Sequence, residues 1–305
     1  MSYVGRFAPS PTGPLHLGSI VTAVASFVHA RQAGGEWLVR IEDIDPPREV
    51  PGAAEDILRT LESLELEWDR SVVYQSSRQD TYRETAEQLF AAGNAFRCDC
   101  SRSTVRAAND ATSVRYPGTC RNKRLTGPDM AIRVRVGEPS PIRFVDGLQA
   151  EQASLLDATT GDYIVLRRDG LPAYHLAVVL DDAAQGVTAI VRGVDLLDST
   201  AAHIHLQRVL GAPTPAYWHL PIVVDERGQK LSKQTGAAPV SAGESGVAVR
   251  ALELLGLTVP AELRAERPRS LWQWAQTHWR IESLRERRAV IQPRKGRPGA
   301  PGRPA

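Results

Sequence analysis

The sequence predicts an α/β fold in which a mainly parallel sheet is flanked by helices and divided by an insertion. Three observations support this class. Apolar runs typical of buried strands alternate with helical patterns in the first part of the chain, and the same alternation returns after residue 160. A region containing all three cysteines separates the two stretches. Strands alternating with helices favour a parallel sheet, because helices form the crossovers between parallel strands.

The first stretch contains one predicted strand and three predicted helices. The run Trp37–Ile41 indicates a buried strand. A helix is expected to begin just after His16, where apolar residues recur at helical spacing: Leu17, Ile20, Val21, Val24, Phe27 and Val28. Two further helix faces are marked by Ile57, Leu58, Leu61 and Leu64, and by Tyr82, Ala86, Leu89 and Phe90.

The second stretch follows the cysteine region. Alternation at Ile132, Val134 and Val136 predicts a half-exposed strand. Three further strands are predicted, at Tyr163–Leu166, Thr188–Val191 and His219–Val224, and an apolar run lies at Leu176–Leu180. A helix is expected at Ala201–Leu210, followed by helical segments near Val247–Leu257 and Leu271–Leu284. The expected divisions are a main body of residues 1–95 and 160–238, an insertion at 96–159, a short helical segment at 239–291 and a disordered Pro/Gly/Arg-rich tail at 292–305.

Composition restricts the class of protein more than it identifies a partner. The 37 Lys and Arg residues nearly balance 35 Asp and Glu residues, so binding to a nucleic acid would depend on a local basic patch. Candidates for such a patch are Arg102, Arg106, Arg115, Arg121, Lys123 and Arg124. No apolar run is long enough to span a bilayer, the first ten residues lack a signal-peptide core, and three cysteines make no disulfide framework. We therefore expect a cytoplasmic protein with no membrane partner.

Two segments far apart in the sequence suit phosphate chemistry. His16-Leu17-Gly18-Ser19 opens a predicted helix, whose free N–H groups and positive dipole end favour a triphosphate. Lys230 and Lys233 lie on a Gly-flanked loop, where two ammonium groups can neutralise charge on a leaving pyrophosphate. Either motif alone is weak evidence, since small residues at helix starts and lysines in loops are common.

The segment Arg6–Ser19 strongly resembles the signature of class I aminoacyl-tRNA synthetases, and within them the glutamyl branch. The motifs known there as HIGH and KMSKS correspond to HLGS (His16–Ser19) and KLSKQ (Lys230–Gln234), which keep the histidine, the glycine and both lysines. The resemblance covers residues 4–236 and implies a split Rossmann-type catalytic domain and a ligase that forms an aminoacyl-adenylate. It further implies catalytic roles for His16, Lys230 and Lys233, and binding of ATP, with Mg²⁺, by His16, Gly18, Ser19 and Lys233.

A pocket for glutamate must hold two carboxylates and one ammonium. Arginine suits a carboxylate because it forms two parallel hydrogen bonds, and Arg6 and Arg192 lie at strand ends or loop starts. Glu42 follows a strand and suits the ammonium, while Tyr174 offers a hydroxyl. Each of these residue types, taken alone, is more often solvated or structural than ligand-binding; His175 is expected to be a packed histidine. The resemblance implies that glutamate is bound by Arg6, Phe7, Ala8, Pro9, Ser10, Glu42, Tyr174 and Arg192.

The cysteines indicate a candidate metal site. Cys98, Cys100 and Cys120 are clustered, which favours zinc in a reducing compartment, although three ordinary thiols remain an alternative. Zinc prefers four ligands, no histidine lies between Cys98 and Cys120, and a turn could bring Tyr116 to the site. The C-x-C and Y-x-x-x-C patterns resemble the zinc site of the glutamyl-Q tRNA(Asp) synthetases. That resemblance implies one structural Zn²⁺ per chain held by Cys98, Cys100, Tyr116 and Cys120.

The glutamyl-Q tRNA(Asp) synthetases are a shortened family without an anticodon-binding domain, and only residues 237–305 follow the KLSKQ loop here. Membership implies that L-glutamate is activated with ATP and transferred to queuosine in the anticodon of tRNA(Asp), by a protein we expect to be a monomer. Three alternatives stay open. One is a truncated glutamyl-tRNA synthetase that charges the CCA end of tRNA(Glu). The others are a plain nucleotidyltransferase, which would not need Arg6, Glu42 and Arg192, and a non-catalytic RNA-binding zinc module, which would not need the paired lysines.

Overall fold

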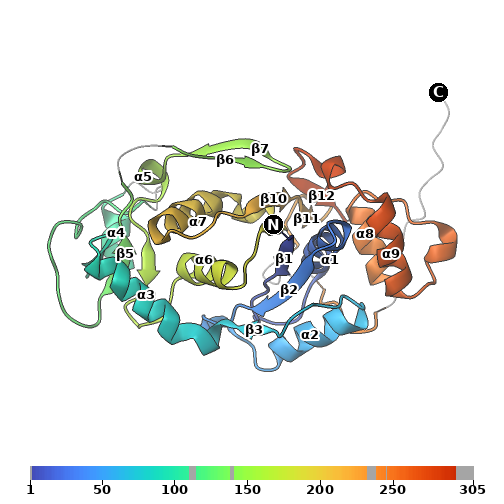
Figure 1. Cartoon of the computed structure of the whole chain (residues 1–305), viewed down its shortest axis with the longest axis horizontal. Helices are drawn as coiled ribbons and strands as arrows, with labels where there is room; N and C mark the ends of the chain where they lie inside the picture. The colour runs from blue at the N-terminus through green and yellow to red at the C-terminus, as the bar shows by residue number, and fades with distance from the viewer. Residues whose placement is uncertain (1, 110–114, 138–140, 232–237, 245, 293–305) are drawn as a thin grey trace.

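A computed structural model describes residues 2–109, 115–137, 141–231, 238–244 and 246–292. Figure 1 shows three regions side by side: an insertion with its own small sheet at one end, an α/β body in the middle, and C-terminal helices at the other end. Helix α1 (Leu17–Gln32) runs through the middle, packed against strands β1 and β9 and against helices α8 (Val247–Leu254) and α9 (Pro268–His278). In the described part of the chain, no helix combines the length and apolarity needed to cross a membrane.

The central sheet is formed by two parallel groups of strands. The first is β1 (Val4–Phe7), β2 (Glu36–Ile41) and β3 (Val73–Tyr74), in the order β1-β2-β3. The second is β9 (Ala189–Gly193), β10 (Ala216–Leu220) and β6 (Ile142–Asp146), extended by the antiparallel β7 (Ala150–Ser154). The groups meet at β1 and β9, where the backbone N–H of Thr188 donates to the carbonyl of Val4 at 2.9 Å. The strand order reverses at this junction, which is where such sheets bind ligands.

The predicted helices and most predicted strands are present. Helix α1 has buried residues on several faces, which fits its place between the sheet and the C-terminal helices. The others in the body are α2 (Ala53–Ser63), α3 (Gln79–Ala91), α6 (Tyr174–Ala184) and α7 (Leu197–Leu210). The predicted segment Leu271–Leu284 divides at Trp279 into α9 and a short 3₁₀ turn at Ile281–Leu284.

Two strand predictions were wrong in detail. The strand β5 (Ala131–Val134) is buried along its whole length instead of half exposed. It lies between β4 (Ala95–Cys98) and β8 (Ile164–Leu166), and its one charged residue, Arg133, is covered as well. The run His219–Val224 contains β10 and β11 (Ile222–Val224) separated by Pro221, which has no N–H to donate. Strand β11 pairs with β12 (Ala289–Ile291), near the end of the described chain.

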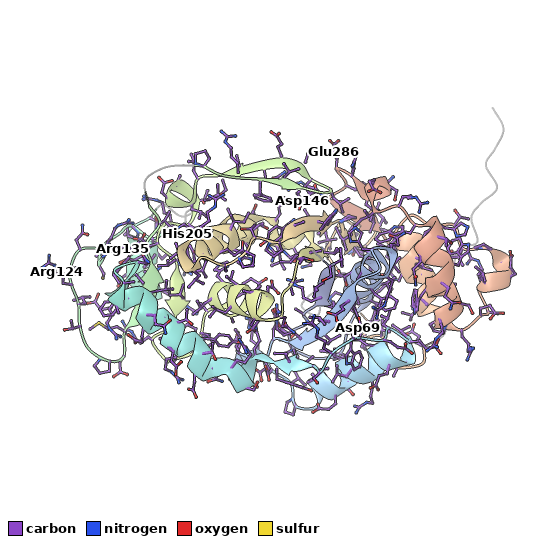
Figure 2. All side chains as sticks on the ribbon, in the orientation of Figure 1. Asp69, Arg124, Arg135, Asp146, His205 and Glu286 are labelled. Carbon is purple, nitrogen blue, oxygen red and sulfur yellow. The ribbon has the colours of Figure 1, made fainter. Side chains whose placement is uncertain are left out.

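The insertion is built on the antiparallel sheet β4-β5-β8, with the short helices α4 (Arg102–Ala107) and α5 (Leu156–Thr159). Figure 2 labels Arg124 and Arg135 at this end of the molecule. The division at 96–159 stays a proposal, and the strand pairing crosses its boundaries: β8 joins the insertion sheet, whereas the β6–β7 hairpin joins the central sheet. The predicted disorder of the tail falls on residues that, from 293 onward, lie outside the described chain.

Candidate active site

A pocket of 510 Å³ opens at the carboxyl ends of β1 and β9. One wall comes from the loop after β1 and the start of α1, the other from the segments that follow β9 and β11. The predicted residues among its lining are Phe7, Pro9, Ser10, His16, Gly18, Ser19 and Lys230. The structure thus brings together the two motifs that the sequence singled out.

His16 caps the helix that faces the pocket. Its Nδ1 accepts a hydrogen bond from the backbone N–H of Ser19 at 3.2 Å, and its Nε2 lies 3.2 Å from the Ser19 hydroxyl. The first turn of α1 contains no acidic residue, so its positive dipole end remains available to an anion. A Cβ on Gly18 would come within 3.1 Å of the His16 ring, which explains the glycine at this position.

Of the two lysines in the second motif, the structure describes Lys230 and leaves Lys233 outside the described residues. The Nζ of Lys230 lies 2.7 Å from Oδ2 of Asp195, both residues line the pocket, and both side chains are partly exposed. An ion pair this exposed is weak, so a triphosphate can compete for the ammonium. Lys233 lies outside the described residues, and its predicted role stays a prediction.

Arg6, on β1, belongs to a buried network of ion pairs. Its Nε lies 3.2 Å from Oδ1 of Asp182, which also lies 2.9 Å from Nη2 of Arg40. Burial alone would raise the pKa of Asp182, but Arg40 and then Arg6 outweigh it and hold that pKa below its usual value. Asp182 therefore stays ionised and fixes Arg6 through Nε, the nitrogen farthest from the tip of the guanidinium.

Glu42 lies just beyond β2, with Oε1 3.4 Å from Nη2 of Arg40. Burial raises the pKa of Glu42, although Arg40 and Arg6 oppose the shift. Its backbone N–H donates to the carbonyl of Pro9 at 3.0 Å, which ties this strand end to the phosphate loop. Glu42 is thus paired with Arg40, but burial outweighs the stabilisation that Arg40 and Arg6 give to its ionised form.

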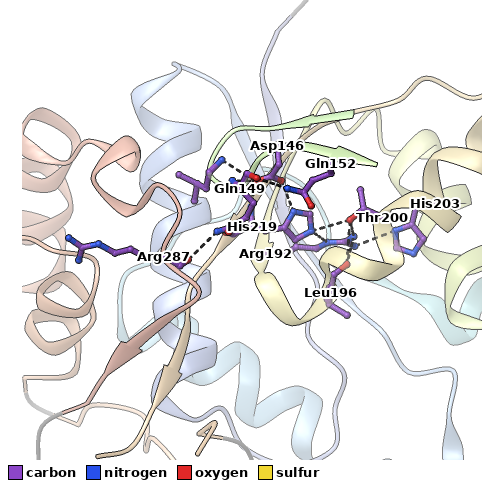
Figure 3. Close-up of polar contacts among 10 residues, drawn as sticks. Asp146, Gln149, Gln152, Arg192, Leu196, Thr200, His203, His219 and Arg287 are labelled. Atoms are coloured by element: carbon purple, nitrogen blue, oxygen red, sulfur yellow. Dashed lines mark hydrogen bonds and ion pairs between the residues drawn. The ribbon is translucent and has the colours of Figure 1, made fainter. Parts of the chain in front are cut away.

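Arg192, at the end of β9, is held almost entirely by neutral acceptors (Figure 3). Its Nη2 donates to the Thr200 hydroxyl at 2.8 Å and to the Leu196 carbonyl at 3.2 Å. Its Nε donates to Nε2 of His219 at 3.1 Å, and its Nη1 lies 3.3 Å from Nδ1 of His203. The guanidinium is therefore buried in a fixed orientation, without a carboxylate of its own.

Tyr174 begins α6 beside these groups. Burial raises the pKa of its phenol, with smaller effects from the charges of Arg192, Glu42 and Arg6. His175 is a packed histidine, as predicted: its ring lies 5.1 Å from that of His203. Burial, reinforced by Arg192, lowers the pKa of His175 to about 4, so it is neutral at pH 7.

Phe7 and Ala8, which follow Arg6 and were also predicted to bind glutamate, do not present their side chains in the way that Arg6 does. The ring of Phe7 is buried and stacks on Trp37 with centroids 6.4 Å apart, so its side chain belongs mainly to the core. Ala8 is only partly buried and is not among the lining residues of the 510 Å³ pocket. Any contact of these residues with an amino acid would involve the backbone of the loop.

The fold and the site can now be compared with known proteins. Residues 3–246 match the family model described as tRNA synthetases class I (E and Q), catalytic domain. This chain belongs to that family. A protein of Aromatoleum aromaticum named glutamyl-Q tRNA(Asp) synthetase is 52% identical over 98% of this chain and 93% of its own length. A protein of Dechloromonas aromatica with the same name is 47% identical over 95% of this chain and 98% of its own length.

Solved structures agree on the fold. A glutamate tRNA ligase from Elizabethkingia meningosepticum superimposes with a TM-score of 0.79 at 24% identity, covering 95% of this chain and 67% of that one. The predicted class I catalytic fold and the ligase class are confirmed. Class I synthetases use ATP with Mg²⁺.

Sequence reasoning missed the residues that hold Arg6 and Arg192 in place. Arg40 and Asp182 fix Arg6, and Asp146 and His219 fix Arg192. A local signal was present for the first pair, because each is a charged residue inside an apolar segment, and a buried charge requires a partner. Nothing local marks the second pair, since Asp146 and His219 are 73 positions apart.

The cysteine cluster forms as predicted in the insertion. The sulfur atoms of Cys98, Cys100 and Cys120 lie within 4.8 Å of one another, and the Tyr116 hydroxyl lies 3.4 Å from Sγ of Cys98 and 3.9 Å from Sγ of Cys100. Ligands about 2.3 Å from a tetrahedral Zn²⁺ are roughly 3.8 Å apart, so the four donors fit such an ion. Hydrogen bonds with Tyr116 and Arg133 lower the pKa of Cys98 despite its burial, whereas burial raises the pKa of Cys120 to about 11. The cluster can therefore bind a metal.

Proposed function

We propose that this protein activates L-glutamate with ATP and transfers the glutamyl group to queuosine in the anticodon of tRNA(Asp). One observation carries the proposal: relatives 47–52% identical over nearly the whole chain are named glutamyl-Q tRNA(Asp) synthetase. The intact phosphate pocket and the charge pattern beside it support the same activity. We also propose that the protein acts as a cytoplasmic monomer.

In the first step, a carboxylate oxygen of glutamate attacks the α-phosphorus of ATP, pyrophosphate leaves, and glutamyl-adenylate forms. The start of α1 and His16 bind the phosphates, while Lys230, and Lys233 on the same loop, neutralise the charge that develops on pyrophosphate. Mg²⁺ bound to ATP supplies further neutralisation of the phosphates. The protein contributes mainly alignment and fixed charge.

The buried charges match a bound glutamate. Arg192 and Arg6 would each receive a carboxylate, and Tyr174 would add a hydroxyl donor. Glu42 would receive the ammonium, which would stabilise the ionised carboxylate further against the effect of its burial. In the second step, a hydroxyl of the queuosine cyclopentenediol attacks the acyl carbon, and AMP leaves.

We further propose one structural Zn²⁺ bound by Cys98, Cys100, Cys120 and Tyr116. The ion would join the end of β4 to the turn before Cys120, where the backbone N–H of Cys120 already donates to the Tyr116 hydroxyl at 2.8 Å. A closed set of four protein ligands suits a structural site, because no position is left for substrate.

The insertion also offers a surface for RNA. A pocket of 690 Å³ beside the cysteine cluster is lined by Arg97, Arg121, Arg124 and Arg135, of which Arg97 pairs with Glu87 and Arg121 with Asp162. The guanidinium of Arg135 lies 5.0 Å from the centre of the Phe96 ring and donates to two backbone carbonyls, so its charge is not neutralised there. Of the predicted basic patch, Arg121 and Arg124 belong to this pocket, and we propose that it binds phosphates of tRNA.

The decisive experiment combines labelled glutamate, ATP and purified tRNA(Asp), with and without queuosine, and with the CCA end intact or removed. The proposal predicts transfer that requires queuosine and persists without the CCA end. Transfer that disappears with the CCA end, or that does not depend on queuosine, would instead support the truncated tRNA(Glu) ligase. Glutamate-dependent exchange of pyrophosphate into ATP, without any tRNA, tests the activation step separately.

A further inference from the structure

Arg192 is oriented by a buried relay from a different part of the chain. Asp146, at the end of β6, lies with Oδ2 2.6 Å from Nδ1 of His219 on β10, and Nε2 of His219 lies 3.1 Å from Nε of Arg192 (Figure 3). All three side chains are at most 3% exposed. Because β6, β10 and β9 are adjacent parallel strands, the relay runs across the sheet toward the pocket.

The hydrogen-bond pattern fixes which nitrogen of His219 carries the hydrogen. Arginine can only donate, so Nε2 of His219 must be the acceptor in its contact with Arg192. The hydrogen of the neutral ring is then on Nδ1, where Asp146 accepts it. A histidine whose tautomer is set by a carboxylate on its far side is a recurring device for orienting a functional group.

Asp146 is itself held in one orientation. Its Oδ1 accepts three backbone N–H groups, from Leu148 at 3.0 Å, Gln149 at 2.8 Å and His219 at 3.2 Å. Only Oδ2 therefore faces the imidazole. The turn that carries these donors is closely packed, since a Cβ on Gly147 would lie 2.1 Å from Nε1 of Trp218.

We propose that Asp146 and His219 are positioning residues for glutamate binding: Asp146 fixes the tautomer of His219, and His219 in turn holds the guanidinium of Arg192 in the orientation that receives a substrate carboxylate. The inference rests on the proposed function, because it requires that Arg192 contacts glutamate. Burial lowers the pKa of His219 despite the opposing effect of Asp146, in keeping with a neutral ring that can accept from Arg192.

Asp146→Asn tests this relay with almost no change of shape. The three backbone donors will keep the amide oxygen at the Oδ1 position, so the amide nitrogen must face Nδ1 of His219. That nitrogen donates, and the hydrogen of His219 moves to Nε2. The new Nε2–H can donate to the Thr200 hydroxyl at 3.1 Å, but Nε2 no longer accepts from Arg192, which loses this contact. In the pyrophosphate-exchange assay we expect the KM for glutamate to rise at least tenfold and the KM for ATP to change less than twofold.

Asp162→Asn is the matched control. Asp162 is equally buried and its Oδ1 also accepts a backbone N–H, from Val136 at 2.8 Å, but it lies in the insertion and contacts Arg121. We expect both KM values of this variant to stay within twofold of wild type. Nitrogen-15 spectra of the histidine rings give a readout that a general loss of stability would not produce: His219 should carry its hydrogen on Nδ1 in wild type and on Nε2 in Asp146→Asn.

A double-mutant cycle shows whether Asp146 acts through His219. His219→Ala alone should raise the KM for glutamate, and adding Asp146→Asn to it should change that KM less than twofold. The inference is wrong if folded Asp146→Asn keeps a normal KM for glutamate, or if its effect is undiminished in the His219→Ala background. A wild type without glutamate-dependent exchange would instead refute the proposed function, and this inference with it.

Discussion

Replacing Arg40 with methionine should destabilise the protein strongly, because Arg40 pairs with three carboxylates, those of Asp181, Asp182 and Glu42. Its Nη2 lies 2.9 Å from Oδ1 of Asp182 and its Nε lies 3.8 Å from Oδ2 of Asp181. Arg40 and Asp181 are fully buried and Asp182 is 3% exposed, so water cannot replace the lost cation. Methionine approximates the length of the side chain, which keeps the change chiefly electrostatic.

The magnitude follows from what each carboxylate retains. Removing one partner of a buried ion pair costs about 3–5 kcal/mol. Asp182 keeps Arg6 at 3.2 Å, and Asp181 keeps Arg78 at 2.7 Å, so neither of these acids is left alone. Glu42 loses its ion pair with Arg40, but it can become neutral by protonation, since burial already raises its pKa. We therefore expect the lower end, about 3 kcal/mol of unfolding free energy, which for a chain of this size lowers Tm by roughly 6–10 °C.

The loss should depend on pH. In wild type the pKa of Asp182 is below its usual value, so its ionised form stabilises the fold above the ordinary carboxyl pKa of about 4, and this contribution disappears as the pH falls. In Arg40→Met, burial prevails and the pKa of Asp182 rises, so protonation relieves the buried charge. The difference in stability between wild type and variant should therefore be largest near pH 7 and shrink toward about pH 4.

Urea unfolding of both proteins between pH 4 and 8 provides the measurement. Arg70→Met is the control, because Arg70 pairs with Glu36 on the surface, where both side chains are more than 40% exposed. Surface pairs contribute about 0–1 kcal/mol. The reasoning fails if Arg40→Met loses no more stability than Arg70→Met, or if its deficit is constant over this pH range.

Three further outcomes are expected. Cys100→Ser should lose most of its zinc by elemental analysis and melt earlier, whereas Tyr116→Phe should keep more, since water can take the fourth position; unchanged zinc in Cys100→Ser would remove that residue from the site. Arg124→Ala should weaken tRNA(Asp) binding and reduce the slope of log K against log salt by about 0.7–0.9, without altering pyrophosphate exchange; an unchanged slope would argue against a phosphate contact. Lys230→Ala should slow exchange by on the order of 10²-fold, and a rate close to wild type would mean that Asp195 is its main partner.

The sequence predicted elements whose pattern is local and missed features that depend on partners. Helix α1, with its start just after His16, was predicted from apolar spacing, because that signal lies within a few residues. Strand β5 was expected to be half exposed because Arg133 interrupts its apolar residues. In the structure the guanidinium of Arg133 lies 3.9 Å from the centre of the Tyr116 ring and donates to the Asp162 carbonyl, and no local pattern indicates those contacts.

The same distinction applies to the site. The phosphate loop was found because its residues are consecutive and form a recognisable motif. The groups that orient Arg6 and Arg192 are far from them in sequence: 176 positions separate Arg6 from Asp182, and 27 separate Arg192 from His219. A sequence can show that a buried charge needs a partner, but the topology of the sheet decides which residue supplies it.

Arg6 and Arg192 differ in how much of their positive charge is already compensated by other groups of the protein. Arg6 contacts the ionised Asp182, whose charge it shares with Arg40. Arg192 contacts a hydroxyl, a carbonyl and two neutral imidazoles, and the carboxylate of Asp146 reaches it only through His219. In a buried site, a cation with neutral partners gains more from a substrate carboxylate than one already paired. Arg192 is therefore suited to bind a carboxylate, and holding it with neutral groups gives it a fixed orientation while leaving its charge for the substrate.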